Sequence, residues 1–174
     1  MAKIDSLRSL LIEELRDLYG AEQRLIKAIP KLVKKVASEE LTEALDSHLA
    51  ETENQVVRLE KAFGLLDEKP KENPCPGMKG IIEEGDERAE AHYEDDQLRD
   101  AAIIGAAQRA EHYEMAGYGA AIALAKMLNL DDVVDLLEQT LAEEEAADEA
   151  LVEIAENVVN VEAANLDEKA DATE

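Results

Sequence analysis

Apolar residues recur every three or four positions along four long segments of the chain, which is the spacing of one face of an α-helix. The segments span about residues 5–36, 38–64, 96–128 and 131–160. Their apolar stripes contain Leu7, Leu11, Leu18, Leu25 and Ile29 in the first segment, Leu41, Leu45, Leu49 and Leu59 in the second, Ile103, Ala107, Ala121 and Ala125 in the third, and Val133, Leu137, Leu141 and Leu151 in the fourth. This pattern predicts four long helices and an all-α fold.

Capping and helix-breaking residues mark the ends of these segments. We predict N-caps at Asp5, Ser38 and Asp131, because short polar side chains can accept hydrogen bonds from the first free N–H groups. Pro30 interrupts the first segment and should kink or split its helix. Asn129 is expected to end the third helix.

The connection between the second and third helices is longer than the other two. Residues 67–80 contain three prolines and two glycines, which predicts a crossover loop, and a short extra helix is expected over residues 80–92. The short turns make each flanking pair antiparallel, and the crossover lets the second pair return onto the first. We therefore predict a ferritin-like four-helix bundle of two antiparallel hairpins over residues 1–160. We expect residues 161–174 to be an acidic, frayed C-terminal tail.

Several carboxylates fall on the faces that should be apolar. At about 100° per residue, Glu22, Glu114 and Glu144 lie near the centres of three stripes. Each lies about 15 residues from the turn of its hairpin, which places all three at one level, roughly 22 Å from the turns. The polar residues near that level are His48 and Glu51 on the second helix, Glu111 on the third and Asp148 on the fourth.

Buried carboxylates repel one another and lose hydration, at a cost of several kcal/mol for each ion. No Lys or Arg is expected on the central stripes at this level, so a bound metal ion is the remaining compensation. Carboxylate oxygens with one imidazole suit iron or manganese. The alternatives are that the central acids are protonated or hydrogen-bonded core groups, that His48 is a satisfied core histidine, and that Glu51 is a surface acid. Glu111 and Asp148 are either ligands or groups that support them, and Tyr118 is expected only to pack.

The net charge of −24 makes cations the natural small partners. It argues against nucleic acid and against an anionic membrane surface, and it suits a halophilic source. Cys75 is the sole cysteine, so no internal disulfide can form. The N-terminus has no apolar signal core and no apolar run is long enough to span a membrane, so we expect a cytoplasmic protein.

Four stretches, residues 13–22, 48–53, 109–114 and 141–148, resemble the YciE/YciF family, and the resemblance covers roughly residues 5–160. It implies a ferritin-like homodimer of bacterial or archaeal origin that is linked to stress responses. The wider ferritin-like pattern has a lone Glu on each of two helices and Glu-x-x-His on the other two. The positions that match are Glu22 and Glu114 for the lone residues and Glu144 for one pair, whereas Ala147, Thr52 and Gln55 replace other members of the pattern.

Because of these replacements, the resemblance does not carry over ferroxidase or oxygenase activity. The leading hypothesis is a stress-response protein with a dinuclear iron or manganese centre, which oxidises Fe²⁺ or consumes peroxide. The candidate metal-site residues are Glu22, His48, Glu51, Glu111, Glu114, Glu144 and Asp148. The alternatives are a non-enzymatic dimeric bundle with a structural or vestigial metal site, and cation storage in a cage.

Overall fold

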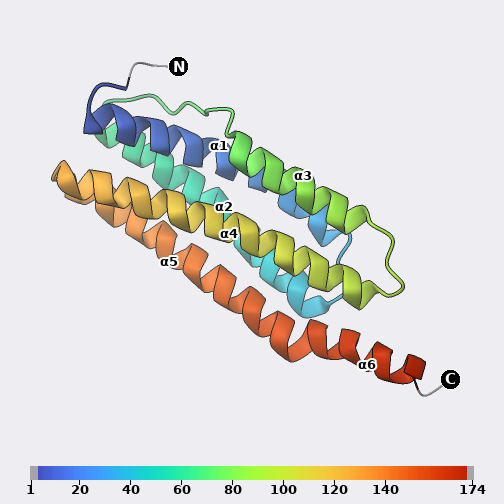
Figure 1. The fold of residues 1–174 in the computed structure, drawn as a ribbon. Coiled ribbons are helices and arrows are strands. Elements are labelled where there is room, and N and C mark those ends of the chain that lie inside the picture. Colours follow the sequence, from blue (N-terminus) through green and yellow to red (C-terminus); the bar gives the residue numbers. More distant parts are fainter. Residues whose placement is uncertain (1–3, 172–174) are drawn as a thin grey trace.

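The computed structural model describes the backbone of residues 4–171 and the side chains as far as residue 165. The regular elements of the described residues are all helices, as predicted (Figure 1). Its elements are α1 (Leu7–Val33), α2 (Glu39–Leu65), α3 (Pro76–Glu90), α4 (Asp96–Met127), α5 (Asp131–Ile154), the π-helical segment η1 (Ala155–Val159) and α6 (Asn160–Asp171).

Four long helices form the bundle, in which α1 pairs with α2 and α4 pairs with α5 (Figure 1). The pairs close through contacts of α1 with α4 and of α2 with α5, while α3 lies outside against α4 and α1. This arrangement confirms two hairpins, a long crossover and an extra helix within it. None of the described helices is both long and apolar enough to cross a membrane.

The start of α1 differs from the prediction. Its N-cap is Ser6 instead of Asp5, because Ser9 at the third helical position completes a reciprocal capping box with Ser6. Pro30 does not split α1, which continues for about one more turn and ends at Val33. The missing N–H of proline therefore removes a hydrogen bond only near the end of the helix. Ser38 is the N-cap of α2 as predicted, since its hydroxyl accepts a hydrogen bond from the Leu41 N–H.

Three other boundaries also differ. Leu130 occupies the N-cap position of α5, and Asp131 is the first helical residue. Helix α3 begins at Pro76, before residue 80, because the fixed φ of proline suits the first helical position. The chain continues as α6 through Asp171, where we expected a frayed tail. Alanine, leucine and glutamate in this stretch are good helix formers. The domain boundary at residue 160 stays a prediction.

The crossover is fastened to α1 and α4 at its end. The Asn73 N–H donates to the Arg16 carbonyl, and a Cβ at Gly20 would overlap the Asn73 carbonyl oxygen, so only glycine fits there. Cys75 is buried, with Sγ 3.2 Å from an Asp17 carboxylate oxygen and 3.3 Å from the Tyr113 hydroxyl. These contacts hold the start of α3 beside the level of the predicted site.

The apolar core is divided into two clusters. The first, here called the α4–α5 turn cluster, includes Leu11, Leu15, Leu18, Leu59, Phe63, Leu66, Ile122, Val133 and Leu137. The second, called the α1–α2 turn cluster, includes Ala21, Leu25, Ile29, Leu41, Leu45, Ile103, Ala107, Ala110 and Leu151. On α2, α4 and α5, buried polar residues stand in the sequence between the members of the two clusters, and on α1 Glu22 stands next to Ala21, where the second cluster begins. We call this the polar layer: Glu22, His48, Thr52, Gln55, Glu111, Glu114, Thr140 and Glu144.

Candidate metal centre

The central carboxylates of the polar layer are fully enclosed. Glu22, Glu114 and Glu144 each have 0% relative exposure, and they come from α1, α4 and α5. Each occupies a position at which the helical repeat turns the side chain toward the bundle axis. The sequence therefore identified the inward direction of all three correctly.

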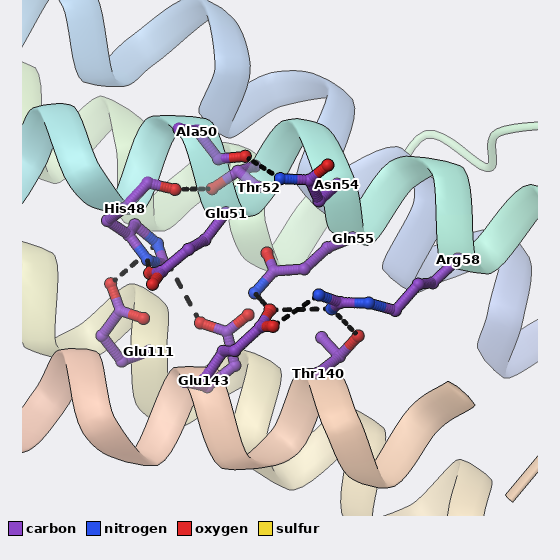
Figure 2. A network of polar contacts seen from close by, with 11 residues as sticks. His48, Ala50, Glu51, Thr52, Asn54, Gln55, Arg58, Glu111, Thr140 and Glu143 are labelled. Carbon is purple, nitrogen blue, oxygen red and sulfur yellow. Dashed lines mark hydrogen bonds and ion pairs between the residues drawn. The ribbon is translucent and has the colours of Figure 1, made fainter. Parts of the chain in front are cut away.

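His48 from α2 and Glu111 from α4 join this group from one side. The His48 Nε2 atom lies 3.3 Å from Glu111 Oε1 (Figure 2). The same atom lies 3.9 Å from Glu144 Oε2. One ligand atom each from His48, Glu111, Glu114 and Glu144 lies within 4.8 Å of the others, and all four residues are buried. Two ligands on opposite sides of one ion would be roughly 4 Å apart, so the group has the size of a metal site.

Glu22 has a hydrogen-bond partner that the sequence did not reveal. The hydroxyl of Tyr118, which we expected only to pack, is fully buried and donates to Glu22 Oε1. Burial and then the neighbouring Glu144 carboxylate raise the pKa of Glu22 well above its ordinary value, and the Tyr118 hydrogen bond partly opposes this. Burial, followed by the charge of Glu22, also raises the pKa of Tyr118, so the phenol stays protonated as the donor.

The other carboxylates of the layer are similarly perturbed. Burial is the main cause that raises the pKa of Glu111 and Glu114 well above the ordinary range, and the neighbouring acids add to it. Burial also raises the pKa of Glu144, while its interaction with Glu111 and the charge of His48 act in the opposite direction. Without a cation, the layer therefore retains protons at pH values where surface acids have lost theirs.

Several buried oxygens in the layer have no hydrogen-bond partner among the described residues. They include both carboxylate oxygens of Glu114 and of Glu144, and one oxygen each of Glu22 and Glu111. Buried polar atoms in folded proteins are nearly always paired, so this concentration of unpaired acceptors is suited to holding a cation. Hard oxygen donors with one imidazole fit iron or manganese.

Glu51 and Asp148 lie outside the four-residue group. The Glu51 side chain is 41% exposed, and its Oε2 atom is 3.7 Å from His48 Nδ1 (Figure 2). Asp148 accepts a hydrogen bond from the Gln108 amide and lies 3.3 Å from Nε2 of the exposed His112. The roles of Glu51 and Asp148 as ligands stay predictions.

The sequence did not predict that an arginine side chain, Arg58, approaches the polar layer. The guanidinium of Arg58 forms a bidentate pair with the Glu143 carboxylate and donates to the Thr140 hydroxyl at 2.9 Å (Figure 2). The Gln55 amide also donates to Glu143, at 3.3 Å. The positive charge of Arg58, like the Tyr118 hydrogen bond, partly opposes the rise that burial causes in the pKa of Glu22. Arg58 lies at the edge of its stripe, from which its long side chain reaches inward, and angular position alone does not reveal such reach.

Comparisons with known proteins agree with this architecture. The chain is 39% identical to protein YciF of Escherichia coli (strain K12) over 161 residues, which cover 92% of this chain and 96% of YciF. The crystal structure of the E. coli stress protein YciF matches with a TM-score of 0.86, over 90% of this chain and 99% of that one.

Two further solved structures are similar. YcfI of Rhodopseudomonas palustris, described as a candidate structural protein, is 43% identical with a TM-score of 0.82, over 86% of this chain and 94% of its own. A protein from Xanthomonas campestris pv. campestris is 20% identical with a TM-score of 0.72, over 95% of this chain and 99% of its own, and that likeness shows the fold alone. The family model described as "Domain of unknown function (DUF892)" matches residues 6–164. The chain therefore belongs to the DUF892 family, and its resemblance to YciF is confirmed.

Proposed function

We propose that this protein is a stress-response protein that binds iron or manganese in its polar layer and uses the metal to oxidise Fe²⁺ or to consume peroxide. The observation that carries the proposal is the buried group of His48, Glu111, Glu114 and Glu144, with ligand atoms within 4.8 Å of one another. The link to stress rests on the relative described as the E. coli stress protein YciF.

The charge of the layer supports two ions. Glu22, Glu111, Glu114 and Glu144 are four buried carboxylates, and the one described guanidinium beside them is already paired with Glu143. Two divalent cations would neutralise the four negative charges of these carboxylates without any contribution from the positive charge of Arg58. We infer that the four-residue group holds one ion and that Glu22, with Glu114 and Glu144, contributes to a second.

The protein's own residues define what the site does. Iron or manganese would supply electron transfer to oxygen or peroxide when bound. Tyr118 holds one oxygen of Glu22 and so fixes the direction of that carboxylate. The α4–α5 turn cluster excludes water from one end of the layer, which strengthens the attraction between the carboxylates and a cation.

Metal binding is tested first. Protein purified without chelator should contain iron or manganese by mass spectrometry, and metal-free protein should bind Mn²⁺ in calorimetric titrations. Glu144→Gln should weaken this binding by at least about tenfold, since it removes a charged ligand. Its neighbour Glu145 is exposed, so Glu145→Gln is the matched control and should bind like the parent. Absence of bound metal, with unchanged melting after chelation, would refute the proposal.

Turnover is tested separately. The parent should oxidise Fe²⁺ faster than buffer alone or remove added peroxide, and Glu114→Gln should lose this activity. Metal binding without either reaction would favour the second candidate, a non-enzymatic bundle with a structural metal, which the description of YcfI supports. The second candidate also predicts that Gln at Glu22, Glu114 and Glu144 leaves the bundle equally or more stable.

The finer expectations belong to the same proposal. We propose a ferritin-like homodimer in the cytoplasm of a salt-adapted cell, on the basis of the family resemblance and the net charge of −24. Light scattering should give the mass of two chains, whereas a much larger particle would indicate a storage cage. The melting temperature should rise with added KCl as screening reduces repulsion among the surface acids.

A further inference from the structure

A pocket of about 200 Å³ lies between α2, α4 and α5, beside the polar layer. Its walls include Ala146, Ala147 and Ala150 of α5, and His48 and Glu111 form its inner side. Each water in the liquid takes up roughly 30 Å³, so the pocket has room for a cation with part of its hydration shell. Ala147 stands where the wider ferritin-like pattern has a histidine, and its methyl group leaves that space open.

The two residues on the inner side of the pocket, His48 and Glu111, each have an unpaired polar atom. The relative exposure is 6% for His48 and 3% for Glu111. Even so, His48 Nδ1 and Glu111 Oε2 have no hydrogen-bond partner among the described residues. The opposite ring nitrogen of His48 faces Glu111 and Glu144 at 3.3 and 3.9 Å. His48 therefore lines the pocket and is also a member of the four-residue group.

Glu51 lines the same pocket and is the more exposed of its two carboxylates. Its Oε2 atom is 3.7 Å from His48 Nδ1 (Figure 2). A hydrated cation attracted by the acidic surface would meet this carboxylate before it met His48 or Glu111.

The opposite end of the layer opposes such passage. There the guanidinium of Arg58 is held by Glu143 and Thr140, and the neutral Arg58–Glu143 pair has no net negative charge to attract a cation (Figure 2). Glu22, Glu114 and Glu144 are themselves fully enclosed. The two ends thus differ in both openness and charge.

We propose that the pocket is the access route for divalent cations, with Glu51 as the capturing carboxylate and the His48–Glu111 pair as the first members of the buried group that the cation reaches, before Glu114 and Glu144. The inference rests on the proposed function, since it requires that the group binds a cation. It gives Glu51 a kinetic role at the mouth of the pocket, in addition to the ligand role predicted from the sequence.

Stopped-flow binding of Co²⁺ to metal-free protein tests the route, with visible absorbance of bound Co²⁺ for association and release to EDTA for dissociation. Ala147→Leu should fill the pocket and slow both association and release by about tenfold or more, while the Kd stays nearly constant. Glu51→Gln should slow association by about threefold to tenfold at low salt, and by less at 0.15 M KCl. Glu53 is exposed on the same helix, so Glu53→Gln is the charge-matched control and should change neither rate.

Three outcomes would overturn the inference. One is parent-like rates in both Ala147→Leu and Glu51→Gln. Another is equal slowing in Glu51→Gln and Glu53→Gln, which would assign the effect to general surface charge. The third is failure of the parent to bind Co²⁺, which would refute the proposed function as well. If Ala147→Leu does not fold, as judged by circular dichroism, the comparison of Glu51→Gln with Glu53→Gln decides the question.

Discussion

At one end of the polar layer a guanidinium closes the bundle, and at the other end a histidine and a glutamate stand beside a pocket. The closed end adjoins the α4–α5 turn cluster, where Leu15, Leu59 and Phe63 are fully buried. The open end adjoins the α1–α2 turn cluster, where Leu45 lies between the pocket of about 200 Å³ and a smaller apolar cavity of about 30 Å³ beside α3.

This difference shows how one bundle can combine rigidity with access. Large apolar side chains and the Arg58–Glu143 pair pack the closed end, and this packing restricts the positions of the buried carboxylates. Alanines at the open end leave space next to His48 and Glu111. A buried metal site requires both properties, because its ligands must keep their positions and the ion must still reach them.

The largest expected effect compares the same substitution in the two clusters. Leu15→Ala should lower the free energy of unfolding by about 4–5 kcal/mol, because it leaves a cavity among fully packed side chains. Leu45→Ala should cost about 2–3 kcal/mol, because Leu45 already borders two cavities. Urea denaturation of the metal-free variants measures both values. Equal losses would show that the two clusters are packed alike.

The stability of the metal-free protein should depend on pH because the carboxyl groups of the polar layer have raised pKa values. Glu22, Glu111, Glu114 and Glu144 all have raised pKa values in the folded state, chiefly because of burial. Such an acid binds its proton more tightly in the folded than in the unfolded chain. Its stabilising contribution is present below the unfolded pKa and is lost as pH rises through the folded pKa.

The melting temperature in EDTA should therefore fall as pH rises from about 5 to about 8, where most surface acids are already ionised. Bound Mn²⁺ should reverse the trend, because a cation favours the ionised carboxylates. Scanning calorimetry with and without Mn²⁺ makes the measurement, and Glu114→Gln should flatten the slope in EDTA. A metal-free melting temperature that is constant over this range would contradict the raised pKa values.

Removal of the Arg58 guanidinium should destabilise the closed end of the polar layer. Arg58→Gln leaves the Glu143 carboxylate, which is only 24% exposed, without its bidentate partner and close to Glu144. We expect a loss of about 1–3 kcal/mol in the metal-free protein. Arg88→Gln breaks an exposed pair with Glu84 and serves as the control, with no measurable change expected in chemical denaturation. A similar result for both arginines would remove Arg58 from the explanation.

The smallest expected effect concerns the tyrosine that holds Glu22. Tyr118→Phe removes a buried hydroxyl donor and should cost about 1–2 kcal/mol in the metal-free protein. Tyr19 also donates to a carboxylate, that of Glu60, but at an exposed position, so Tyr19→Phe should cost clearly less. Thermal denaturation of the two variants side by side makes the comparison. If they lose the same stability, the hydrogen bond to Glu22 has no special weight.

The sequence alone determined the helices and the inward direction of the main acids. Helical periodicity is a local property, so it indicated that Glu22, Glu114 and Glu144 face the axis, and the lengths of the hairpins placed them at one level. The capping residue of α1 and the start of α3 were less well predicted. The start of α1 depends on which of two adjacent polar residues makes the better capping hydrogen bonds, and the start of α3 depends on the fixed φ of Pro76.

Only the tertiary structure decided which neighbours complete the site. His48 joins Glu111 and Glu144 because α2 packs against α5 in one particular register, whereas Glu51, one turn along, remains at the rim. Arg58 and Tyr118 reach the layer with long side chains from positions that periodicity assigns to an edge or to packing. Periodicity gives the direction of each side chain on its own helix, but the distance between side chains on different helices depends on how those helices pack.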